Sequence, residues 1–219
     1  MSPEGASQAQ WHQRTLDRSL RSARARALSR GDRFITAAAE LLRETGKPEF
    51  TVQEVVDRSG MSLRSFYHHF ATKDDLLLAL IEETITSYVK RAQPKIEAID
   101  DPVKKLRVFV EMLYGDEDSD DPAARGMVIF HRQLADSRTD EFVASLIPQT
   151  ELLHGILEAG VASGAFRDDI PVNVLAAFIT HSMVSMLDMR VMGISLADEH
   201  IGADDFWKCC LGVVATPAS

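Results

Sequence analysis

Apolar residues recur along almost the whole chain with the spacing of amphipathic helices. The first such segment runs from Arg30 to Thr45, where residues at i, i+3, i+4, i+7 and i+8 would form one buried face. These apolar positions are Phe34, Ala37, Ala38, Leu41 and Leu42. Gly46 and Pro48 follow, and such residues are typical of the end of a helix.

Two short helices are predicted next. Thr51, followed three residues later by Glu54, forms a capping box in which each side chain satisfies a free backbone N–H near the helix start. The buried stripe of this helix would consist of Val52, Val55 and Val56. Gly60 should end it, and Ser62 should cap a further helix that reaches Phe70. The pattern therefore predicts a helix, a tight turn and a helix.

The same periodicity continues to the C-terminus. We expect further helices at about Lys73–Ala92, Pro102–Tyr114, Pro122–Ala135, Thr139–Gly164, Val172–Met192 and Ala203–Val214. Pro94 is expected to end the first of them, and Pro148 to kink or divide the fourth. The segment Val172–Met192 is apolar nearly all round, which suits burial against both its own subunit and a partner.

The predicted fold is therefore all-α, with an N-terminal three-helix helix-turn-helix head on a larger helical bundle. We divide the chain into a basic arm, partly disordered or helical, at residues 1–29, the helix-turn-helix head at 30–75, and the larger helical domain at 76–219. The hydrophobic share of 45% and the charged share of 26% are ordinary for a soluble protein.

Charge is distributed unevenly between the two ends of the chain. Residues 1–73 carry 12 Lys and Arg against 8 Asp and Glu, a net charge of +4, whereas residues 74–219 carry 12 against 25, a net charge of −13. The basic end contains Arg14, Arg18, Arg21, Arg24, Arg26, Arg30 and Arg33, with only Asp17 and Asp32 to oppose them. These arginines could contact a phosphate backbone or could form a solvated arm.

Several other classes are disfavoured. No apolar run approaches the roughly 18 residues that span a bilayer, and the N-terminus lacks a signal-peptide stretch, so we expect a cytoplasmic protein without a membrane partner. Cys209 and Cys210 are expected to be buried packing residues. The acidic run at 115–122 lacks the ligand spacing of an EF-hand and is predicted to be a solvated linker. No shared metal spacing relates His131, His154, His181 and His200, so no metal is expected.

The helix ending at Phe70 carries the candidate chemistry. Helical geometry places on one side Leu63, Phe66 and Phe70. It places on the other side Arg64, Ser65 and His68, with Tyr67 at the boundary. A guanidinium can bridge guanine O6 and N7, and a major groove admits a helix. From this helix alone, a solvated surface is an equally good explanation.

The stretch TVQEVVDRSGMSLRSFYHHFATK, from Thr51 to Lys73, resembles the DNA-binding signature of the TetR (tetracycline repressor) family. The matching features are a threonine at the second-helix cap, Gly-x-Ser at the turn, an aromatic-Tyr-His-His-Phe block, and a lysine before the fourth helix. The resemblance covers about residues 30–80. The remainder is similar only in its helical layout and length.

This resemblance implies roles for individual residues. Backbone phosphate contacts would fall to Thr51, Tyr67, His69 and Lys73. Base edges would be approached by Leu63, Arg64, Ser65 and His68, and Ser62 would cap the helix whose N-terminus points at the duplex. Leu63 departs from the polar residue often found at its position, so it would contact a thymine methyl or extend the core. Tyr67 could instead be a half-buried core edge.

A single short recognition helix contacts too few base pairs to select one site in a genome, so a homodimer on a palindromic operator is expected. By resemblance, the helices at 172–192 and 203–214 would form the twofold interface. The body is far larger than a dimerisation device needs and holds no assembled catalytic constellation. We therefore predict a site for a small, largely apolar effector. Its candidate residues, each also typical of a core, are Phe109, Met112, Met127, Phe130, His131, Phe178, His181 and Met186.

The sequence thus predicts a DNA-binding transcriptional regulator, a repressor that its effector releases from DNA, with no enzymatic activity and no cofactor. Release would follow from a population shift in which the helix starting near Lys73 moves the DNA-binding heads. Two alternatives remain open: a helical enzyme or carrier that binds a small molecule, and a nonspecific architectural DNA binder. The net charge of −9 argues against the latter.

Overall fold

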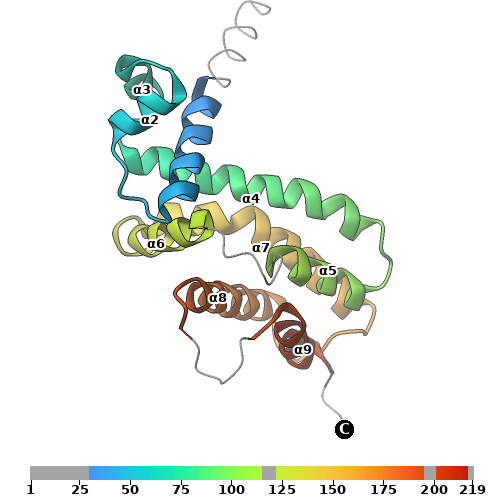
Figure 1. Cartoon of the computed structure of the whole chain (residues 1–219). Helices are drawn as coiled ribbons and strands as arrows, with labels where there is room; N and C mark the ends of the chain where they lie inside the picture. The colour runs from blue at the N-terminus through green and yellow to red at the C-terminus, as the bar shows by residue number, and fades with distance from the viewer. Residues whose placement is uncertain (1–29, 115–121, 195–200, 217–219) are drawn as a thin grey trace, which may run out of the picture.

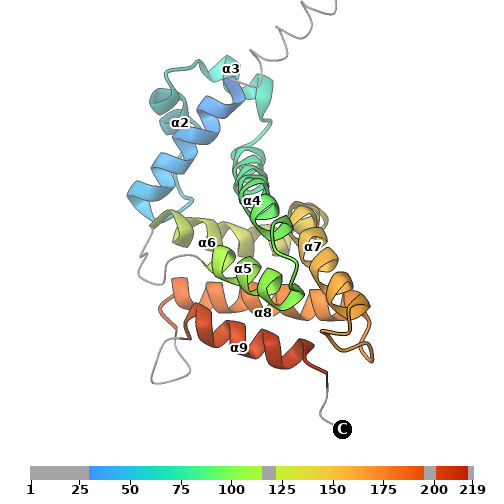
Figure 2. The ribbon, with the colours of Figure 1, turned by 90° about the vertical axis from the view of Figure 1, so that its right-hand side faces the viewer.

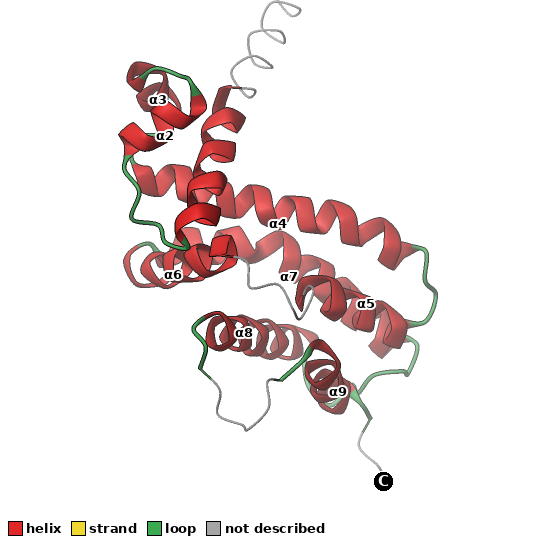
Figure 3. Ribbon diagram, in the orientation of Figure 1, coloured by secondary structure: helices red, strands yellow, loops and turns green. Residues whose placement is uncertain are grey.

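The computed structural model describes residues 30–114, 122–194 and 201–216, and every regular element within them is a helix (Figures 1 and 3). The N-terminal helix occupies residues 30–45. It is followed by α2 (Val52–Ser59), α3 (Leu63–His69), α4 (Lys73–Glu97), α5 (Pro102–Tyr114), α6 (Pro122–Ser137), α7 (Thr139–Ala162), α8 (Val172–Val191) and α9 (Ala203–Val214). The predicted all-α class is confirmed. The predictions for the arm at 1–29, the loop at 115–121 and His200 lie outside the described residues.

The caps predicted for the two short helices are present. The Thr51 hydroxyl accepts a hydrogen bond from the Glu54 backbone N–H at 3.2 Å, and the Thr51 backbone N–H donates to Glu54 Oε2 at 2.6 Å. Gly60 ends α2 with a φ of 63°, a left-handed conformation that suits a residue without Cβ. These local signals fix where α2 ends and at what angle α3 leaves it.

The helices form an elongated body with a small head at one end. Figure 1 shows the N-terminal helix, α2 and α3 at this end, and α4 extending from them over the body. In the perpendicular view of Figure 2, α6 lies between the head and α8, and α8 and α9 run side by side at the far end. A displacement of α4 or α6 would therefore be transmitted to the head.

Buried apolar side chains form two clusters, which we name the head core and the body core. The head core joins the N-terminal helix, α2 and α3 to the first part of α4, from Leu76 to Ile85, and includes Phe130 and Leu134 of α6. The body core begins on α4 at Tyr88 and continues through α5, α7, α8 and α9. Among the helices that the structure describes, only α4 contributes buried residues to both cores, so it links them directly.

Two prolines lie inside helices. Pro94 does not end its helix as predicted, because α4 continues to Glu97 and buries Ile96. Pro148 does not divide α7, which runs from Thr139 to Ala162, and a kink at this position stays a prediction. A proline removes the hydrogen bond that its own nitrogen would donate and crowds the carbonyl four residues earlier, but packing of the flanking turns can outweigh that cost.

Two further predictions are wrong. Cys209 is exposed, and only Cys210 is buried, because neighbours on a helix face different directions. Within the described residues, the 18-residue window Val172–Met189 of α8, with a mean hydropathy of 1.4, is long and apolar enough to cross a membrane. The expectation that no run approaches this length therefore fails. Four apolar side chains of the window are buried in the body core, namely Leu175, Ala176, Ile179 and Met183, although only 28% of the window is buried.

Candidate nucleic-acid interface and effector site

An aromatic cluster holds α3 in place. Phe66 is fully buried and lies edge-to-face with Phe34, with ring centroids 5.4 Å apart. Phe70 closes the cluster at 5.7 Å from Phe66 and 6.2 Å from Phe34. Because edge-to-face aromatic packing defines both distance and orientation, this cluster fixes the rotation of α3 about its axis.

The opposite face of α3 is exposed. The exposed fractions are 44% for Leu63 and 57% for Tyr67, and Arg64 and His68 are exposed as well. Ser65 and His69 are half-buried. Leu63 therefore does not extend the core, and Tyr67 contacts Phe66 with one edge of its ring while the rest of the side chain projects outward. A surface with this composition can meet base edges and phosphates.

The predicted phosphate contacts flank this face and are partly engaged within the protein. Thr51 is exposed at the start of α2. The Lys73 ammonium donates to the Pro48 carbonyl at 2.8 Å and lies 5.6 Å from the centre of the Phe50 ring. These contacts hold the ammonium in place, and two of its three donors remain for a phosphate.

His69 is set up as a neutral donor. Burial, followed by the positive charges of His68 and Arg30, lowers the pKa of His69 below its ordinary value. At neutral pH its imidazole is therefore uncharged and can contact a phosphate only through an N–H. Ser62 caps α3 by accepting from the Ser65 backbone N–H at 3.1 Å, so its hydroxyl also has an internal role.

Two arginines hold α2 in position, a role that the sequence analysis did not predict for either of them. Both terminal nitrogens of Arg58 bond the carboxylate of Glu44 on the N-terminal helix at 2.7 Å. Arg33, which the charge pattern grouped with the basic arm, donates to the Ser59 carbonyl at 2.6 Å. Since Arg33 and Ser59 are 26 residues apart, no local pattern could have paired them.

The structure distributes the predicted effector residues over several places. Phe109 is fully buried in the body core, against which Met112 and Met186 also pack. Phe130 belongs to the head core, and Met127 packs against it. The His131 ring lies between α6 and α7, 5.6 Å from the ring of Phe142. Two of the predicted residues are exposed on α8, namely Phe178 and His181. The eight residues therefore do not meet at one point.

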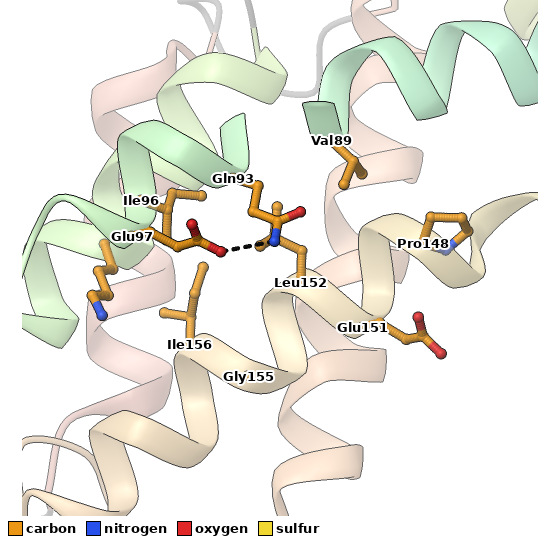
Figure 4. Close-up of a pocket in the computed structure, with 10 residues that line it drawn as sticks. Val89, Gln93, Ile96, Glu97, Pro148, Glu151, Leu152, Gly155 and Ile156 are labelled. Carbon is orange, nitrogen blue, oxygen red and sulfur yellow. Dashed lines mark hydrogen bonds between the residues drawn. The ribbon is translucent and has the colours of Figure 1, made fainter. Parts of the chain in front are cut away.

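A groove with a volume of about 430 Å³ lies between α4 and α7 (Figure 4). Its walls combine apolar residues such as Leu152 and Ile156 with polar residues at the rim, where Gln93 Nε2 donates to Glu97 Oε1 at 2.7 Å. None of the predicted effector residues lines it. Among the described residues, no group of three His, Cys, Asp or Glu side chains is placed to hold a metal ion.

Comparisons with known proteins agree with this geometry. Residues 34–80 match the family model described as "Bacterial regulatory proteins, tetR family". The chain is 25% identical over 178 residues to the HTH-type transcriptional repressor KstR2 of Mycolicibacterium smegmatis, an alignment that covers 80% of this chain and 85% of the relative. It is 28% identical over 171 residues to the regulator EthR of the same organism, covering 77% of this chain and 76% of EthR.

Solved structures share the fold. The crystal structure of FadR from Bacillus subtilis in complex with stearoyl-CoA superimposes with a TM-score of 0.69 at 20% identity, over 83% of this chain and 98% of that one. A FadR from Bacillus halodurans gives a TM-score of 0.70 at 22% identity, over 84% and 95% of the two chains. Residues 34–80, with the aromatic-anchored α3, therefore form a DNA-binding domain of the TetR family of bacterial regulators, and the chain is similar to transcriptional regulators of this type over most of its length.

Proposed function

We propose that the protein is a cytoplasmic homodimeric repressor that binds a palindromic operator through α3 and leaves it when a small, largely apolar effector binds the body. The observation that carries the proposal is the outward face of α3, held by Phe66 and Phe70 and presenting Arg64, Tyr67 and His68. This face has the size and chemistry for a major groove. Residues 30–75 would read DNA, and residues 76–219 would bind the effector and the second subunit.

The surface of α8 supports the dimer. Val174 and Phe178 are exposed to 50% and 55%, although they lie on an apolar helix at the end of the body away from the head. Burial of large apolar side chains is the main favourable term in association. A second copy of this surface, related by a twofold axis, would cover these side chains and place two α3 helices on one side of the dimer.

The relatives support an apolar effector. KstR2 is named a transcriptional repressor, and FadR of Bacillus subtilis was crystallised with stearoyl-CoA, a molecule with a long apolar chain. In this protein, effector binding would favour an arrangement in which α4 no longer holds the heads at the spacing of successive major grooves. A coupling of about 1–3 kcal/mol, or about 5- to 150-fold in DNA affinity, is typical of such regulators.

The experiment is selection of bound duplexes from a random library, followed by binding measurements with the Arg64→Ala and Tyr67→Ala double variant. We expect the selected duplexes to share an inverted repeat. The double variant should bind this repeat about 5- to 150-fold more weakly, because a bidentate base contact is lost. The helical circular dichroism should be unchanged, since both side chains are exposed. Arg91→Ala, on the exposed surface of α4, is the matched control and should bind normally. No preference of the unaltered protein for any inverted repeat would contradict the proposal.

A further inference from the structure

Two polar atoms inside the body have no hydrogen-bond partner among the described residues. They are Nε2 of His131 on α6 and Oγ1 of Thr180 on α8. Thr180 is only 7% exposed. Leaving a buried polar group unpaired costs about 1–3 kcal/mol, so native proteins rarely do so without a reason, and an unseen bound molecule is one such reason.

The two residues lie on helices that pack against each other, and α7 packs against both of these helices. The His131 ring contacts Phe142 of α7. Ser145 and Gln149 follow Phe142 by three and seven residues, a spacing that places all three on one face of that helix. Ser145 and Gln149 are buried, with exposed fractions of 4% and 6%. Polar side chains from α6, α7 and α8 thus occupy the interior of the body.

These polar groups mark a seam between the two apolar cores. Along α4, the head core ends at Ile85 and the body core begins at Tyr88. Along α7, Leu146 packs against the head core, whereas Leu153 belongs to the body core. Gln149 stands between these two leucines. An interior divided in this way suits a ligand that lies along apolar walls and has a polar group at the seam.

The charges at the seam are balanced. Burial lowers the pKa of His131, so its imidazole is neutral at neutral pH. Asp188 acts on His131 in the opposite direction, but its carboxylate is paired with Arg132 at 3.2 Å. The unpartnered atoms therefore belong to a neutral imidazole and a hydroxyl. Such atoms recognise an uncharged oxygen better than a carboxylate or an ammonium.

We propose that His131 and Thr180 are the polar anchors of the effector site, and that the effector is an uncharged, mainly apolar molecule carrying an alcohol or ketone oxygen. The inference rests on the proposed function and specifies its effector. The ligand oxygen accepts one hydrogen bond from the Thr180 hydroxyl and another from the N–H at Nε2 of the neutral His131 imidazole. Binding therefore draws together α6, whose Phe130 and Leu134 are part of the head core, and α8 at the far end of the body.

The test uses the full chain with four probes of equal chain length: decan-1-ol, decan-2-one, decanoate and decane. Their binding is measured by the shift of the thermal midpoint and by release from the selected operator. The variants His131→Phe and Thr180→Val each remove one unpartnered atom and keep most of the shape. The matched controls are His154→Phe and Thr150→Val on α7, because the Thr150 hydroxyl is already satisfied by the Leu146 carbonyl at 2.8 Å.

We expect the unaltered protein to bind the alcohol and the ketone more tightly than decane or decanoate. Each anchor variant should lose about 2- to 10-fold in affinity for the alcohol, the usual worth of one hydrogen bond, and keep its affinity for decane. Without probe, both anchor variants should be at least as stable as the unaltered protein, because an unsatisfied polar atom has been removed. The two control variants should behave like the unaltered protein with every probe.

Equal binding of decane and decan-1-ol by the unaltered protein would overturn the inference, as would anchor variants that retain the preference for oxygen. A loss of stability in the anchor variants without probe, beyond that of the controls, would also overturn it by showing that the two atoms have partners in the free protein. Operator selection without probe tests the proposed function separately, since probe binding is read from the thermal midpoint even if no operator is found.

Discussion

At the scale of single residues, internal contacts decide which side chains of the head remain for DNA. Arg58 and Arg33 are held by Glu44 and by the Ser59 carbonyl, so neither is an unengaged cation. The sequence predicted the buried aromatics of α3 correctly from their spacing. It grouped Leu63 with them, but Leu63 stands in the first turn of α3, outside the reach of the aromatic cluster, and is exposed.

His131 gives a prediction about pH. Because its pKa is lowered in the folded protein, the unfolded chain binds a proton more readily as the pH falls through about 6.5. The free energy of unfolding should therefore be highest above that pH and should decrease as the pH falls from 7.5 to 5.5. Urea unfolding across this range should show a shallower decrease for His131→Phe. The same slope in both proteins would show that His131 is not the group that titrates.

At the scale of elements, the sequence predicted most helix boundaries, because caps and periodicity are local signals. Pro102–Tyr114 and Ala203–Val214 match the predicted ranges. The prediction that Pro94 ends its helix was wrong because the effect of a proline depends on its surroundings. Ile96, beyond Pro94, is buried by tertiary packing, which no local rule contains. The effector residues were predicted as apolar side chains and two histidines on the body helices, and residue type alone cannot tell a cavity wall from a core.

Two glycines of α7 allow a paired prediction. A methyl group at Gly160 would collide with the ring of Phe166, whereas one at Gly155 would meet nothing within 4 Å. Gly160→Ala should therefore destabilise the fold by about 1–3 kcal/mol through overpacking. Gly155→Ala should stabilise it by about 0.5–1 kcal/mol, because alanine loses less backbone entropy in a helix.

Thermal denaturation of the two variants checks this, since 1 kcal/mol shifts the midpoint by about 2–4 °C in a protein of this size. The midpoints should move in opposite directions from that of the unaltered chain. Similar shifts for both variants would mean that α7 does not pack against Phe166 in solution.

At the scale of the whole molecule, the head and the body are joined by more than α4. The Arg138 guanidinium, at the junction of α6 and α7, bonds Asp75 at the start of α4 at 2.9 Å and also bonds Glu141. Gly126 of α6 lies against Leu42 and the turn at Gly46. The sequence could not predict these contacts, because the partners are 63 and at least 80 residues apart.

Gly126 tests this connection. A methyl group at that position would come within 2.5 Å of Leu42 Cδ2 and 3.3 Å of the Lys47 nitrogen, so the buried Leu42 side chain and the turn at Gly46 must shift to make room. We expect Gly126→Ala to weaken operator binding severalfold, because the head is displaced relative to the body. Gly155→Ala on α7, where nothing lies within 4 Å, is the control. Titration of operator duplex measures both, and equal affinities would contradict the connection.

Phe130 and Leu134 of α6 belong to the head core, and this determines where the head can be separated from the body. A fragment that ends after α4 would lack the side chains of Phe130 and Leu134 from its interior. It would therefore expose an apolar cavity beside α4. A chimera that joins this head to the ligand-binding domain of another protein should therefore include α6 as well. In the same way, mutations that keep the protein on its operator permanently, or prevent it from binding there, should occur in α6 as readily as in α3.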